Sequence, residues 1–187
     1  MLLNNKMSIF TQIKNFFQKW INKGKALYVK ITSHPLFQIH KPIIYAFGIV
    51  FVCAVILSLL TKIGFFQYFV AFYLLLFGAL EIRDIKDFKK VFERYDPLSY
   101  WFPWYSGFYP YISILFGLML ILDYFAFIAL VFIIIMFSTQ AYGIWKIMKK
   151  EPQIPHINMG PKYKMPLSKL ILLESGIIVL FSLLILF

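Results

Sequence analysis

The sequence predicts an all-α integral membrane protein, a bundle of about five transmembrane helices preceded by an amphipathic helix in the membrane interface. Of its 187 residues, 61% are hydrophobic and only 14% are charged, and the mean hydropathy is +0.76. A water-soluble fold of this size needs polar surface that such a composition cannot supply. Five apolar runs approach the roughly 20 residues that a helix needs to cross a bilayer. Basic residues gather between alternate runs, as they do at the cytoplasmic ends of membrane helices.

The first 41 residues are a basic segment with seven lysines. Its apolar residues recur at helical spacing, with lysines between them: Ile9, Phe10, Ile13, Phe16, Phe17, Trp20 and Ile21. This pattern is typical of a helix that lies in the plane of the membrane interface. We expect the segment to orient the bundle; a docking surface for another subunit is the alternative.

The bundle is predicted to occupy residues 42–187. Its spans are expected near 42–60, 64–80, 109–122, 125–144 and 167–187. Only Asp123 and Tyr124 separate the third span from the fourth, so these two helices should form an antiparallel hairpin.

A surface helix is predicted over residues 83–95, "RDIKDFKKVFERY". Apolar residues line one face and charged residues the other. Acids and bases nearly balance, so ion pairs three or four residues apart are expected.

The distribution of positive charge predicts the orientation. Residues 1–41, 81–106 and 145–169 carry seven, five and six Lys or Arg, whereas the other two connections carry Lys62 alone and none. With five spans, all three basic segments fall on one side, which gives a cytoplasmic N-terminus and an outside C-terminus in a bacterial-type inner membrane. The formal net charge of +11 thus fits anionic lipid headgroups, and no nucleic-acid partner is expected.

The connection "YDPLSYWFPWYSGFYPY", residues 95–111, holds nine aromatic residues and three prolines. Tyr and Trp favour the headgroup level, and Pro97, Pro103 and Pro110 should prevent a continuous helix. We expect a bent segment wedged against the bundle. The alternative is a ligand corner of Trp104, Tyr105 and Tyr109 that acts together with Glu174 and could bind a quinone or another flat apolar molecule.

Glu174 lies about seven residues into the last span, where an ionisable group is costly unless it is paired or protonated. It is therefore the leading candidate for a functional residue, with a purely structural role in helix register as the alternative. Its expected partners lie near the end of the fourth span: Ser138, Thr139, Gln140 and Tyr142.

His156 and Met159 raise a metal-site hypothesis, since imidazole and thioether groups suit soft or borderline metals. Solvated loop residues are the alternative. The single cysteine, Cys53, is expected to be a buried apolar residue. Enzyme motifs are absent, so the sequence predicts no catalytic residue, and it does not identify a cofactor.

Residues 42–187 resemble the MauE/DoxX-type redox-associated membrane proteins. The resemblance rests on a "D-x-x-x-F" surface helix, a "Y-D-P" turn, a proline–aromatic string and a tail with a Gly, a Pro-x-Ser and an intramembrane acid. The residues in register are Asp84, Phe88, Tyr95, Asp96, Pro97, Pro103, Tyr105, Tyr109, Pro110, Gly117, Met159, Gly160, Met165, Pro166, Leu167, Ser168 and Glu174.

The chain departs from this family at three places. Members commonly carry Cys-x-Cys where it has His156 and Asn158, a Glu where it has Ser113, and a Lys where it has Glu81. Thiol exchange needs thiol groups, so dithiol chemistry is not expected here.

The resemblance implies a non-catalytic accessory or scaffold subunit. Such a subunit would help in the assembly, maturation or anchoring of a membrane redox or envelope complex, with methylamine dehydrogenase as the family's example. Two alternatives stay open, a quinone-interacting electron-transfer protein and a heavy-metal transporter or metal chaperone. The expected partners are the lipid bilayer and other membrane-protein subunits.

Overall fold

The computed structural model describes residues 18–19, 21–25, 33, 35–151, 155–156, 165–166 and 169–187. The chain divides into two compact units, Met1–Lys41 and Pro42–Phe187. Most of the predicted interfacial helix in the first unit lies outside the described residues, although residues 21–25 are helical and exposed. The features that bear on function belong to the second unit.

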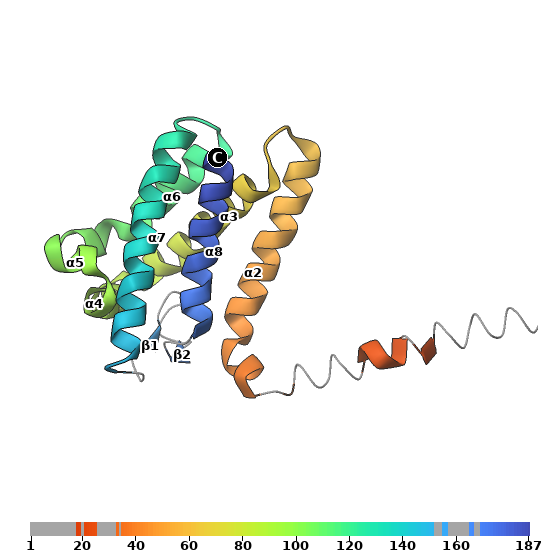
Figure 1. The fold of residues 1–187 in the computed structure, drawn as a ribbon, viewed down its shortest axis with the longest axis horizontal. Coiled ribbons are helices and arrows are strands. Elements are labelled where there is room, and N and C mark those ends of the chain that lie inside the picture. Colours follow the sequence, from red (N-terminus) through yellow and green to blue (C-terminus); the bar gives the residue numbers. More distant parts are fainter. Residues whose placement is uncertain are drawn as a thin grey trace, which may run out of the picture. The chain divides into compact units, whose positions relative to one another are not determined.

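The described part of the chain is helical apart from two strands of two residues each (Figure 1). The elements are α2 (Pro35–Leu60), α3 (Phe65–Arg83), α4 (Ile85–Tyr95), α5 (Pro97–Trp101), α6 (Tyr105–Ile121), α7 (Ala126–Met148), β1 (Pro155–His156), β2 (Met165–Pro166) and α8 (Lys169–Leu186). The strands pair antiparallel, with His156 opposite Met165. The predicted helical fold class is thus confirmed.

Three of the described helices are long and apolar enough to cross a membrane: His40–Leu60, Phe65–Arg83 and Ala126–Met148. The helices Tyr105–Ile121 and Ile171–Leu186 are apolar but shorter. These helices make the chain a membrane protein by length and composition.

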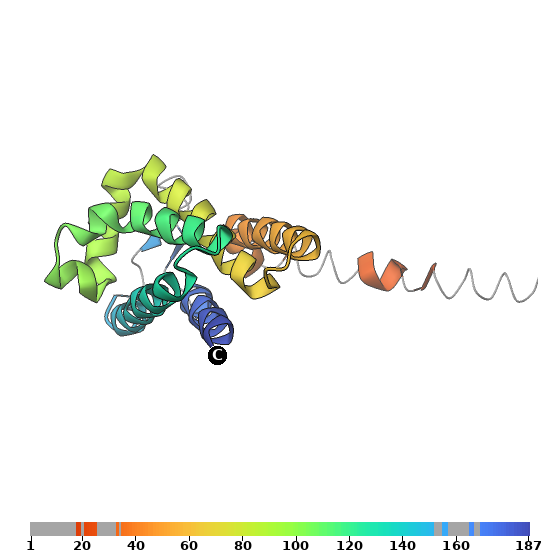
Figure 2. The same cartoon turned by 90° about the horizontal axis from the view of Figure 1, so that it is seen from above.

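Glycines allow α3 and α6 to pack closely in the second unit. A Cβ atom on Gly78 of α3 would lie 2.9 Å from the carbonyl oxygen of Pro110, and one on Gly117 of α6 would lie 2.9 Å from that of Ala71. Each helix therefore offers a glycine to the backbone of the other, the usual way in which membrane helices approach closely. The other close pair is α7 and α8, which lie side by side in Figures 1 and 2.

The expectation that all three prolines break the helix is wrong for Pro110. Pro97 starts α5 after the N-cap residue Asp96, and Pro103 lies in the turn before α6, but Pro110 is inside α6. A proline removes one helical hydrogen bond, which neighbouring groups can offset in a packed membrane helix. The third apolar helix consequently begins at Tyr105, four residues before the predicted start at 109.

The helix α4 is amphipathic, as its pattern predicts. Phe88, Phe92 and Tyr95 are buried, while Lys89 pairs with Glu93 at 3.8 Å on the exposed side. Rings of the buried face contact α6, with the Phe92 and Tyr109 centroids 4.4 Å apart.

The predicted hairpin of α6 and α7 forms, and its turn contains two residues with left-handed backbone, Asp123 (φ 52°) and Phe125 (φ 53°). The side chain of Gln67 on α3 ties this turn to the bundle. Its Nε2 donates to the carbonyl oxygen of Leu120 and to Oδ1 of Asp123, both at 2.9 Å.

Candidate functional site

Glu174 is buried on α8, with 3% of its surface exposed. The hydroxyl of Tyr73 on α3 donates a hydrogen bond of 2.5 Å to its Oε1. Its Oε2 is buried without a hydrogen-bond partner among the described residues. The sequence predicted a partner for Glu174 on the fourth apolar helix. Among the described residues its one hydrogen bond comes instead from Tyr73 on α3, so this prediction is wrong for that bond.

None of the four residues predicted as partners of Glu174 forms its observed hydrogen bond, and Gln140, the buried one, accepts from the hydroxyl of Tyr109 instead. Ser138 and Tyr142 are exposed, and Thr139 donates to the carbonyl oxygens of Ile135 and Met136 on its own helix. Helical spacing places these residues at a depth in the bundle similar to that of Glu174. It does not determine which neighbouring helix the Glu174 side chain faces.

Glu81, near the C-terminal end of α3, is a second buried acid. Only 2% of its surface is exposed, and its Oε2 has no hydrogen-bond partner among the described residues. It lines a small internal void together with Tyr73, Tyr109 and Ser113. The sequence analysis missed Glu81 as a site residue, although an acid at the end of an apolar run is a signal that could have found it.

The two acids belong to one buried polar cluster, which we define as Tyr73, Glu81, Tyr109, Gln140 and Glu174. The hydroxyl of Tyr73 donates to Glu174, and Tyr73 also lines the void beside Glu81. The hydroxyl of Tyr109 donates to Oε1 of Gln140 at 3.5 Å. The cluster thus connects α3, α6, α7 and α8 through polar groups.

No basic side chain among the described residues pairs with Glu81 or Glu174. The ion pairs found there are Arg83–Asp84, Lys89–Glu93, Lys90–Asp87 and Arg94–Glu151, all with exposed or half-buried partners. An isolated charge inside a membrane bundle is costly, so a proton or a bound cation has to neutralise such a carboxylate. The chemistry that this cluster offers is the holding of protons on its two carboxyl groups.

The three aromatic side chains of the predicted ligand corner do not gather in one site, because Tyr105 and Tyr109 pack together and Trp104 lies apart from them. Tyr105 and Tyr109 are buried, and both rings lie against Phe92 of α4. Trp104 is 59% exposed. Of the three, Tyr109 reaches the buried polar cluster.

An apolar pocket of about 220 Å³ lies beside Glu174. Ile43, Ile44 and Phe47 of α2 form one wall, and Leu173 and Ile177 of α8 flank the carboxyl group. Its lining, apolar with one polar group, is that of a ligand site, but its volume is below the roughly 300–1,000 Å³ of sites for drug-sized ligands. Sequence patterns could not reveal it, because it depends on how α2 lies against α8.

The loop between α7 and α8 carries the predicted metal ligands. Met159 lies outside the described residues, and His156 belongs to β1, of which the structure describes the backbone and not the side chains. The metal hypothesis at these two residues therefore stays a prediction.

Asp96 caps α5 on the surface side of the bundle. Its Oδ2 accepts hydrogen bonds from the backbone nitrogen of Ser99 at 2.8 Å and from Oγ of Ser99 at 3.0 Å. Burial raises the pKa of Asp96 from 3.8 to about 6, against the opposing effect of the Ser99 hydrogen bonds. The aspartate that the "Y-D-P" resemblance singled out is thus a helix cap.

The apolar helices and their buried acids define a polytopic helical membrane protein. A family model described as "Methylamine utilisation protein MauE" matches residues 57–187. The chain belongs to this MauE family, which confirms the resemblance found in the sequence. Comparison with curated proteins and with solved structures gave no significant match.

Proposed function

We propose that this MauE-family membrane protein is a non-catalytic accessory or scaffold subunit. It would support the assembly, maturation or anchoring of a membrane redox or envelope complex. Family membership supports this role, since the match covers residues 57–187. The structural observation that supports a partner subunit is an exposed aromatic surface beside α5.

This surface, which we call the aromatic platform, consists of five exposed rings. They are Tyr100, Trp101, Phe102, Trp104 and Phe108, exposed to 82%, 73%, 52%, 59% and 57%. Large, stiff aromatic side chains are enriched at the centres of protein interfaces. The platform therefore suits a partner subunit at the edge of the membrane.

The platform is held on a fixed support. Asp96 caps the short helix that carries Tyr100 and Trp101. Buried Tyr105, which follows Trp104 directly, has its ring 6.2 Å from that of Phe92. A surface that is ordered before binding loses less conformational entropy on association.

We further propose five spans with a cytoplasmic N-terminus and an outside C-terminus in an inner membrane. At one end of the second unit, residues of α4, α5 and the end of α7 line one pocket, so two of the three basic segments meet there. At the other end, Gln67 joins the α6–α7 turn, which carries no base, and the nearby connection has only Lys62. This asymmetry supports the assignment of the basic end to the cytoplasm.

A second candidate function rests on the apolar pocket at Glu174. Its apolar walls and single carboxyl group would accept a quinone or another flat apolar molecule that can hydrogen-bond to Glu174. The protein would then take part in electron transfer. A Glu174→Gln variant that still assembles but loses activity of the parent complex would favour this candidate.

The test of the accessory role is a mild-detergent pull-down of the tagged protein from its native membrane. Mass spectrometry, quinone analysis and metal analysis are applied to the same eluate. The proposal expects a stoichiometric set of redox or envelope subunits. If the protein is recovered alone with a quinone, the accessory role is refuted in favour of the second candidate function. If it is recovered alone with metal, the result favours metal transport or metal delivery through His156 and Met159.

A further inference from the structure

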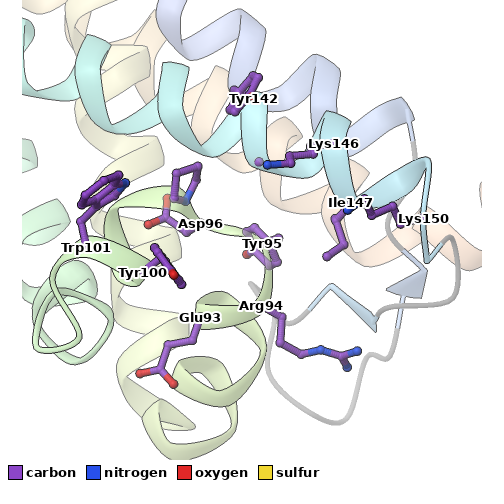
Figure 3. A pocket seen from close by; sticks show the side chains of 12 residues that line it. Glu93, Arg94, Tyr95, Asp96, Tyr100, Trp101, Tyr142, Lys146, Ile147 and Lys150 are labelled. Carbon is purple, nitrogen blue, oxygen red and sulfur yellow. The ribbon is translucent and has the colours of Figure 1, made fainter.

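A pocket of about 450 Å³ opens at the basic end of the second unit. It lies between the end of α4, the short helix α5 and the last turns of α7. Figure 3 shows Tyr95, Asp96, Tyr100 and Trp101 on the side of α4 and α5, opposite the α7 ribbon that carries Lys146. This pocket is separate from the one at Glu174.

The two walls of the pocket are in close contact at Gly143 and Tyr95. A Cβ atom on Gly143 of α7 would lie only 1.8 Å from the carbonyl oxygen of Tyr95 and 2.8 Å from Cδ of Pro97. Only a glycine allows this approach. The spacing between the walls is therefore set by packing and does not depend on a ligand.

The charged side chains around the pocket leave an excess of positive charge. Arg94 is paired with Glu151 at 2.7 Å, and Glu93 accepts from Ser106 at 2.7 Å while also pairing with Lys89. Two further lysines line the pocket, and among the residues that the structure describes they make no ion pair: Lys146 and Lys150.

Of the two acids in the lining, Asp96 is buried and Glu93 is paired with Lys89. One oxygen of Asp96 accepts both hydrogen bonds from Ser99, and only 2% of the residue is exposed. The exposed lysines Lys146 and Lys150 are therefore the unpaired charges of the lining among the described residues.

Exposed aromatic rings stand beside these lysines. Tyr100, Trp101 and Tyr142 line the pocket and are exposed to 82%, 73% and 54%. Tyr and Trp rings in this combination with Lys are typical of the headgroup layer. Basic pockets between membrane helices on the cytoplasmic side bind phosphate-bearing lipid headgroups.

We propose that this pocket binds the headgroup of one anionic phospholipid. Lys146 and Lys150 contact its phosphate, and the rings of Tyr100, Trp101 and Tyr142 contact its glycerol and upper acyl chain. This binding site goes beyond the accessory role and does not depend on it. The site would fix one lipid against Tyr100 and Trp101, two rings that also belong to the aromatic platform.

The test is native mass spectrometry of the full-length protein in detergent, titrated with phosphatidylglycerol or phosphatidylcholine. The wild type should retain one phosphatidylglycerol in clear preference to phosphatidylcholine. Each lysine near an anionic lipid is worth about 1 kcal/mol, so Lys146→Gln with Lys150→Gln should weaken phosphatidylglycerol binding ~30-fold. The double arginine variant, Lys146→Arg with Lys150→Arg, should bind as the wild type does.

The matched control is Lys149→Gln with Lys62→Gln, which removes the same net charge. The Nζ of Lys149 lies 3.6 Å from the centroid of the Trp145 ring, and neither lysine lines the pocket. This variant should retain phosphatidylglycerol binding. Equal loss in both double variants, or equal retention of both lipids by the wild type, would overturn the proposal. Displacement of the lipid by millimolar inorganic phosphate would assign the pocket to a soluble phosphate compound instead.

Discussion

Tyr73 and Glu174 lie 101 residues apart in the chain, yet the tyrosine hydroxyl donates a hydrogen bond of 2.5 Å to the carboxyl group. Both side chains are buried, so the bond joins α3 to α8 inside the bundle. A tyrosine donor satisfies one carboxyl oxygen without placing a positive charge in the interior. The acid can therefore be kept at this depth without a salt bridge.

The first prediction concerns this hydrogen bond. Tyr73→Phe should lower the free energy of unfolding in detergent by roughly 1–3 kcal/mol, because it leaves a buried carboxyl oxygen without its donor. Glu174→Gln keeps an acceptor oxygen for Tyr73 and should change stability by less than about 1 kcal/mol. Thermal unfolding of both variants checks this, and equal stability of Tyr73→Phe and the wild type would show that the bond is unimportant.

The second prediction concerns the two acids. Glu81→Gln and Glu174→Gln each alter one of two buried carboxyl groups that share Tyr73 as a neighbour, so their effects on stability should not add. A double-mutant cycle should give an interaction free energy between about 0.5 and 3 kcal/mol. Additive effects within experimental error would mean that the two groups act separately.

The third prediction concerns the contact at Gly143. Gly143→Ala should destabilise the protein by at least about 2 kcal/mol, because its Cβ would overlap the Tyr95 carbonyl oxygen and force α7 away from α5. Gly176→Ala is the matched control, since Gly176 lies in α8 with nothing within 4 Å of an added Cβ. The control should be neutral or more stable by up to about 1 kcal/mol. A Gly143→Ala protein as stable as the control would contradict the close contact.

The fourth prediction is a pH dependence. The pKa of Asp96 rises from 3.8 to about 6 on folding, so folded protein binds a proton that unfolded protein has lost between these values. This contribution to stability is complete below about pH 4 and is lost as pH rises to 6, a difference of roughly 3 kcal/mol. Asp96→Asn should remove that slope and keep the cap on α5. Unfolding midpoints measured from pH 4 to pH 7 test this, and an unchanged slope in the variant would refute the assignment to Asp96.

Much of the fold follows from local pattern. Hydropathy predicts the apolar helices, and the spacing of Phe88 and Phe92 predicts the buried face of α4, because both depend on neighbouring residues along the chain. The position of Pro110 inside α6 did not follow, since a proline in a packed membrane helix depends on neighbours such as Gly78 of α3.

The candidate site was less predictable from the sequence, because it too depends on contacts between residues far apart in the chain. Burial of Glu174 could be read from its depth in an apolar run, but its partner Tyr73 comes from a distant helix. The pocket between α4, α5 and α7 depends on one glycine, Gly143, whose role appears only when the Tyr95 carbonyl lies beside it. Such contacts between distant segments leave no periodic signal in the sequence.

The accessory role depends on a protein partner at the aromatic platform, and site-specific photo-crosslinking in the native membrane tests this most directly. A benzoylphenylalanine at Trp101, exposed to 73%, is compared with one at Tyr124, exposed to 65% in the α6–α7 turn. We predict that the probe at position 101 forms a covalent product with a subunit of a redox or envelope complex and that the probe at 124 does not. Products with lipid alone at both positions would contradict the proposed role.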